Sequence, residues 1–87
     1  MEKSHITSEL IRAARALLRW EQRQLAEASS VSLPTVKRLE ASPGLLIAHA
    51  STVAALLHAL EIAGIEFIDE NGGGAGVRLK KPPKKRN

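Results

Sequence analysis

Two groups of cationic side chains are the residues of this sequence best suited to bind another molecule. Lys37 and Arg38 are adjacent near the middle of the chain, and no acid accompanies the second group, at the C-terminal end: Lys80, Lys81, Lys84, Lys85 and Arg86. Ammonium and guanidinium groups bind phosphate oxygens, and a guanidinium can also donate to O6 and N7 of one guanine. Residues 41–79 contain one basic side chain, Arg78, and four acids: Glu61, Glu66, Asp69 and Glu70. The charge pattern therefore predicts a polyanionic partner for the N-terminal half and the tail.

The sequence offers no comparable set of residues for catalysis or metal binding. It has no cysteine, and His5, His49 and His58 are scattered without the spacing of metal ligands. No nucleophile–base pair or cluster of carboxylates can be assigned to one cleft. Gly72, Gly73 and Gly74 lack the strand–loop–helix context of a phosphate loop, so a turn is expected there. We expect neither enzymatic activity nor a metal or other cofactor.

The length and the apolar content predict one small domain away from the membrane. The chain has 87 residues, and no segment approaches the roughly 20 consecutive apolar residues that span a bilayer. The polar start, Met1 to Thr7, does not resemble a signal peptide. A soluble, cytoplasmic protein is the expectation.

Apolar spacing and capping residues predict four helices. Residues 8–19 form an amphipathic stripe, with Thr7 and Ser8 as candidate N-caps. A short helix is expected over residues 22–29 and another over residues 32–40, where Ser32 is the N-cap and Pro34 falls in the first turn. Ser51 is expected to cap a fourth helix, which ends at Gly64.

The period changes after Gly64 and predicts a β-hairpin over residues 65–80, followed by a disordered basic tail over residues 81–87. The fold class is thus mainly α: a four-helix domain over residues 1–64 with a C-terminal hairpin. Because an isolated hairpin is marginal in water, this one must pack on a helix or pair with a second chain. We expect a homodimer, with five apolar residues in or near its interface: Ile65, Phe67, Ile68, Val77 and Leu79.

Residues 22–40 have the form of a helix-turn-helix, two short helices joined by a short turn. The segment resembles the phage-repressor/Cro-like family, also called the XRE family, and the resemblance extends over about residues 8–60. The matching features are Gln22 opening the second helix, Leu25-Ala26 at the helix crossing, Val31 in the turn, Ser32 capping the third helix, Val36 and Leu39 buried, and Glu40 closing that helix.

The resemblance implies a small bacterial regulator that binds double-stranded DNA in a sequence-specific manner, most simply as a repressor, with residues 32–40 in the major groove. The implied DNA-binding residues are Gln22 and Arg23 at the second helix, and Ser32, Leu33, Pro34, Thr35, Lys37 and Arg38 at the third. Arg38 is the candidate for base readout and Gln22 for a phosphate contact, while the tail would hold the DNA backbone. The resemblance also implies that Arg15 pairs with Glu40 as a structural tie.

Three departures from the family pattern leave a second interpretation open. Glu21 stands where the family has a Ser or Thr cap, and Ser30 stands where it has glycine. The loop after the third helix lacks lysine and arginine and contains the apolar run Leu45-Leu46-Ile47. The alternative is therefore a protein-binding module on a helix-turn-helix scaffold, an antiactivator or an antitoxin, that acts through this apolar loop.

Overall fold

The computed structural model describes residues 5–80, which form four helices and one antiparallel hairpin. The elements are α1 (Ser8–Leu18), α2 (Gln22–Ser29), α3 (Leu33–Ala41), α4 (Ala50–Ile62), β1 (Ile65–Ile68) and β2 (Gly76–Leu79). This architecture confirms the mainly helical fold with a C-terminal hairpin that the sequence predicts. Within residues 5–80 no helix is long and apolar enough to cross a membrane.

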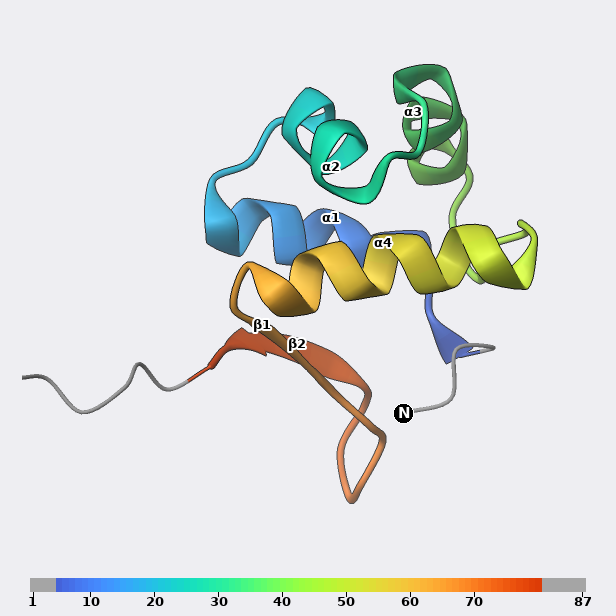
Figure 1. Cartoon of the computed structure of the whole chain (residues 1–87). Coiled ribbons are helices and arrows are strands. Elements are labelled where there is room, and N and C mark those ends of the chain that lie inside the picture. The colour runs from blue at the N-terminus through green and yellow to red at the C-terminus, as the bar shows by residue number, and fades with distance from the viewer. Residues whose placement is uncertain (1–4, 81–87) are drawn as a thin grey trace, which may run out of the picture.

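The elements form three layers, with α1 and α4 in the middle. Helices α2 and α3 contact each other and lie on one side of α1 and α4, while the hairpin lies on the other side (Figure 1). Strand β2 packs against α1, and β1 packs against α4. The hairpin is thus attached to the helical domain of its own chain.

The core is aliphatic and draws on all three layers. Its most deeply buried large side chains are each exposed by 1% or less: Ile6, Ile11, Leu25, Val36, Leu56, Leu60 and Ile65. The burial of Ile65 corrects the expectation that this residue lies at a dimer interface. Its side chain is fully covered by its own chain, because β1 begins directly beneath α4.

Helix α1 is capped by one of the two candidate residues. The hydroxyl of Thr7 accepts a hydrogen bond from the Leu10 backbone N–H at 3.1 Å, whereas Ser8 is fully buried. Helix α4 begins two residues earlier than a Ser51 cap predicts, at Ala50. The Ser51 cap was wrong: His49 occupies the N-cap position and makes no capping side-chain bond. At the other end, Gly64 has φ of +116°, as the predicted helix stop requires.

A short antiparallel bridge joins the start of the described chain to the loop after α3. The Ser8 N–H donates to the Gly44 carbonyl at 2.9 Å, and the Leu46 N–H donates to the Ile6 carbonyl at 3.0 Å. The Glu9 carboxylate accepts from the Gly44 N–H at 3.1 Å. Hydrogen bonds from its own backbone N–H and from that of Gly44 lower the pKa of Glu9. The sequence does not predict this bridge, because pairing over so few residues leaves no periodic pattern.

The hairpin presents one apolar and one charged face. Cross-strand pairing places Phe67 opposite Val77 on the face that packs on the helices, and Glu66 opposite Arg78 on the other face. The Arg78 guanidinium donates to both Glu66 carboxylate oxygens, at 3.1 and 3.2 Å. These hydrogen bonds, together with the charge of Arg78, lower the pKa of Glu66.

The Glu66–Arg78 pair predicts a small pH-dependent contribution to stability. Because the pKa of Glu66 is lowered in the folded chain, its contribution is fully present above the unfolded pKa of about 4.3 and is lost as the pH falls through the lowered value. Glu66→Gln should therefore melt below the wild type at pH 7, and the two melting temperatures should converge near pH 3. Glu61→Gln, which changes an exposed acid of α4, is the control. A Glu66→Gln difference that persists at low pH would contradict the assignment.

Candidate nucleic-acid interface

The turn between α2 and α3 is built by three serines and a valine, in the order Ser29-Ser30-Val31-Ser32. Ser29 donates its hydroxyl to the Leu25 carbonyl at 2.7 Å and accepts from the Val31 N–H at 3.2 Å. Ser30 follows with φ of 62°, in the left-handed region. Ser32 then caps α3 by accepting from the Thr35 N–H at 3.3 Å, as predicted. The turn is therefore fixed by local hydrogen bonds.

Ser30→Gly should stabilise the protein by up to about 1 kcal/mol, because glycine adopts positive φ without the strain a side chain suffers. Chemical denaturation with an unchanged m-value would measure the gain. Ser42→Gly is the matched control: Ser42 is an exposed serine with φ of −98°, where glycine brings no relief of strain. A loss of stability in Ser30→Gly would show that the Ser30 side chain stabilises the turn.

Helix α3 has an apolar inner face and a cationic outer face. Val36 and Leu39 are buried in the core, while Pro34, Lys37 and Arg38 are exposed. Leu33 is half-buried: it packs against the core and also lines a surface hollow with Arg23 and Ser32.

Ser32 and Thr35 stand together at the N-terminus of α3. Ser32 is exposed and Thr35 is half-buried. The Ser32 hydroxyl donates to the Thr35 hydroxyl at 2.9 Å, which orients both side chains.

Glu40 is the buried junction of α1, α2 and α3. Its carboxylate accepts from Nε and Nη2 of Arg15, at 2.7 and 2.6 Å, and from Nε2 of Gln22 at 2.9 Å. The Glu40 backbone carbonyl accepts from Nη1 of Arg12 at 2.6 Å. The implied Arg15–Glu40 pair is confirmed. The Glu40 side chain is only 3% exposed, so α3 shows no acid to the solvent.

The start of α2 carries the two remaining helical candidates. Gln22 is half-buried, and its contact with Glu40 is one that the sequence does not predict. Arg23 is exposed. The Glu21 N–H donates to Oε1 of Gln24 at 2.8 Å, which satisfies a free donor at the helix start. The Glu21 side chain is exposed, so a negative charge lies beside Gln22.

The apolar loop splits into three different environments. Leu46 is half-buried and packs against the core. Ile47 is 84% exposed and borders a hollow of about 350 Å³ next to α3, whose walls are Thr35, Arg38, Ile47, Ala48, His49 and Thr52. Sequence reasoning missed His49 and Thr52 as neighbours of Arg38. The only available signal is their place near the start of α4.

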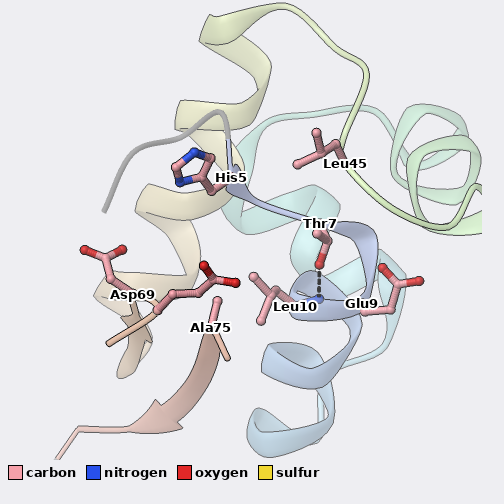
Figure 2. Close-up of a pocket in the computed structure, with 8 residues that line it drawn as sticks. His5, Thr7, Glu9, Leu10, Leu45, Asp69 and Ala75 are labelled. Carbon is pink, nitrogen blue, oxygen red and sulfur yellow. Dashed lines mark hydrogen bonds between the residues drawn. The ribbon is translucent and has the colours of Figure 1, made fainter. Parts of the chain in front are cut away.

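Leu45 lines a different cleft, of about 720 Å³, away from α2 and α3. Figure 2 shows its residues, which come from the start of the described chain, α1, the loop after α3 and the hairpin turn: His5, Thr7, Glu9, Leu10, Leu45, Asp69, Glu70 and Ala75. Three carboxylates make this cleft unsuitable for a polyanion. The cationic face of α3 and the acidic cleft are therefore separate surfaces.

The predicted tail lies almost wholly outside the described residues. Lys80 is exposed, and its N–H donates to the Gly64 carbonyl at 2.7 Å. The other four tail candidates, Lys81, Lys84, Lys85 and Arg86, fall beyond residue 80.

Of the predicted dimer residues, Phe67, Ile68 and Val77 are half-buried and Leu79 is 50% exposed. The hairpin thus keeps apolar surface that its own helices do not fully cover.

Residues 5–80 contain no group of three histidine, aspartate or glutamate side chains placed to hold a metal ion.

The chain matches no family model and no curated protein, so comparison with known proteins adds no family assignment.

Proposed function

We propose that this protein is a sequence-specific double-stranded DNA-binding regulator, a dimeric repressor of the helix-turn-helix type, in which α3 enters the major groove. The observation that supports this most directly is the outer face of α3. Lys37 and Arg38 are exposed there, and the one acid of the helix, Glu40, is buried and paired with Arg15. An exposed helix face with cations and no acid suits the negative potential of DNA.

The contacts divide into base readout and backbone positioning. Arg38 reads a guanine, because its fork of donors matches O6 and N7. Lys37 and Thr35 contact phosphates. Gln22 keeps one amide hydrogen for a phosphate at the start of α2, where free backbone N–H groups favour an anion. The hydrogen bond from Nε2 of Gln22 to the Glu40 carboxylate orients that amide.

The smaller candidates have supporting roles. Pro34 and Ser32 lie next to the base edges in the major groove. Arg23 and Lys80 contact the DNA backbone on either side of the site. The tail residues Lys81, Lys84, Lys85 and Arg86 add affinity that depends on salt but little on sequence.

A salt-titrated binding assay tests the proposal. Purified full-length protein is mixed with labelled DNA from upstream of its own gene, and unlabelled random DNA is added as competitor. Binding that persists in excess competitor at physiological salt supports a site-specific regulator. Binding that random DNA removes, or none at all, overturns it.

A second candidate function rests on Ile47. Its side chain is 84% exposed and that of Leu45, in the same loop, is 56% exposed, and large apolar side chains are typical of the core of protein–protein interfaces. In this alternative the chain binds a protein partner, as an antiactivator or antitoxin does, through Ile47 and Leu45.

Two variants discriminate the functions. Charge reversal at Lys37 and Arg38 should abolish repression if DNA binding is the function. If only Ile47→Asp does so, the protein-binding alternative is correct.

A further inference from the structure

The acidic cleft of about 720 Å³ between the start of α1, the loop after α3 and the hairpin turn contains apolar surface that is open to the solvent. In Figure 2 the hairpin turn, with Asp69 and Ala75, faces the start of α1, with Leu10. Leu45 lines the same cleft and remains 56% exposed. A hollow of several hundred Å³ with apolar walls and a few polar groups is the usual form of a binding site.

Charge selects a cationic occupant for this cleft. Glu9, Asp69 and Glu70 are all exposed where they line it, and neither lysine nor arginine is among the described residues that do so. The Glu9 carboxylate accepts from the Gly44 N–H at 3.1 Å and lies 3.7 Å from the Arg12 guanidinium. A further cation is therefore expected at the other wall, beside Asp69 and Glu70 of the hairpin turn.

The chain itself supplies a segment of matching charge, the basic tail, which we define as residues 81–87. It follows directly on Lys80, contains no acid, and holds four cations: Lys81, Lys84, Lys85 and Arg86. Its positive charge complements the acids of the cleft, and the aliphatic stems of lysine and arginine cover apolar surface while their charged ends stay in water. The basic tail thus suits both the charge and the apolar surface of the cleft.

The place where the basic tail begins allows it to reach this cleft. The Lys80 N–H donates to the Gly64 carbonyl at 2.7 Å, which fixes the start of the tail at the end of the hairpin opposite its turn. Lys80 lies five positions after Ala75, about 17 Å along an extended strand. The six residues 81–86 span about 20 Å when extended. The last cations of the tail can therefore return to the cleft along the hairpin.

We propose that the basic tail docks in the acidic cleft of its own chain, with its last three cations beside Asp69 and Glu70 and their stems against Leu45. Single exposed ion pairs are weak, but the short connection to Lys80 gives the tail a high effective concentration at the cleft. A docked cation is withheld from DNA, because it cannot contact a carboxylate and a phosphate at once. Docking does not depend on the proposed function; only its effect on DNA binding does.

Paramagnetic broadening in the full-length protein tests the docking. The chain has no cysteine, so Asn87→Cys provides a single attachment point for a nitroxide spin label. At about 0.1 M salt the label should reduce the amide signal intensity of Leu45 and of residues 69–75, and leave that of α2, on the other side of α1 and α4, unchanged (Figure 1). The intensity should return at about 1 M salt, because the Debye length falls from about 10 Å to about 3 Å.

Asp69→Asn combined with Glu70→Gln removes two charges of the cleft with almost no change in side-chain size and should restore the intensity at about 0.1 M salt. Glu27→Gln combined with Glu61→Gln removes two exposed acids outside the cleft and is the matched control, which should leave the broadening unchanged. Broadening that survives the cleft double variant, or an unbroadened wild type, overturns the inference.

A mixed sample separates docking within one chain from docking between copies. Spin-labelled chains are combined with isotope-labelled chains that carry no spin label, and no broadening is expected. Broadening as strong as in the single-chain sample would place the tail in the cleft of a second copy and overturn the inference. If the cleft variant is unfolded, neutralising the tail by Lys84→Gln, Lys85→Gln and Arg86→Gln decides the test, because it should restore the same intensity.

Affinity for random DNA is measured separately. The cleft double variant should bind about two- to fivefold more tightly than the wild type, because exposed ion pairs no longer compete for the tail, and neutralising the tail should remove this difference. A gain that persists without the tail cations overturns the competition. Broadening without any DNA binding removes the proposed function and leaves the docking. Site-specific DNA binding without broadening removes the docking and leaves the proposed function.

Discussion

Glu40→Ala is expected to lower the free energy of unfolding by about 3–5 kcal/mol, because it leaves the mostly buried Arg15 guanidinium without its counter-charge. Arg15 and Gln22 both donate to the Glu40 carboxylate, and the Arg15 side chain is only 18% exposed. Small domains have a total stability of about 5–15 kcal/mol, so this variant should be largely unfolded at modest temperature. Urea titration followed by circular dichroism measures the loss.

A double-mutant cycle supplies the control for that expectation. Replacing both partners, Arg15→Met with Glu40→Leu, removes the charge and its counter-charge together, so the loss should be well below the sum of the two single losses. Glu9→Ala changes an acid of α1 that is 51% exposed and should have a much smaller effect. Additive losses at Arg15 and Glu40 would contradict the view that the pair acts as one unit.

Arg38→Ala is expected to weaken binding to the specific DNA site by about 5- to 150-fold, equivalent to about 1–3 kcal/mol, and to relax discrimination at one base pair. The exposed guanidinium leaves α3 beside the hollow formed with Ile47 and His49, so its loss should leave the fold unchanged. Affinity for random DNA should fall less. Fluorescence anisotropy with a specific duplex and its single-base variants measures both effects.

Lys37→Ala is the matched variant on the same helix face. As a phosphate contact it should lower affinity about equally on all sequences and reduce the slope of log affinity against log salt by about 1. If Arg38→Ala shows this uniform behaviour, Arg38 is a backbone contact. If neither change alters DNA binding, the outer face of α3 has another role.

Helices were the part of the fold that local chemistry could predict. Apolar spacing fixed α1 and α3 to within a residue or two, and Ser32 and Gly64 marked two boundaries correctly because capping needs only neighbouring residues. The start of α4 was misplaced, since His49 occupies the N-cap without a side-chain bond. The hairpin followed from a glycine run between two apolar segments.

Contacts between distant residues were harder to predict. The bridge between Thr7 and Leu45 and the Gln22–Glu40 hydrogen bond depend on how helices meet in space, which no local pattern encodes. Ile65 shows the same limit: alternation places it on the inner face of the hairpin, but only the position of α4 makes it fully buried. For the candidate site, sequence located Lys37 and Arg38, and the structure added their neighbours.

The bridge between residues 6–8 and 44–46 also determines how the loop after α3 meets a partner. Two backbone hydrogen bonds and the Glu9 carboxylate hold this loop in place within the free protein. Fixing a backbone residue costs about 1–2 kcal/mol of conformational entropy. For this loop, the cost lowers the free energy of unfolding and does not weaken the binding of a partner. Whatever binds beside Ile47 therefore meets a preorganised surface, and its affinity is not reduced by the ordering of residues 44–46.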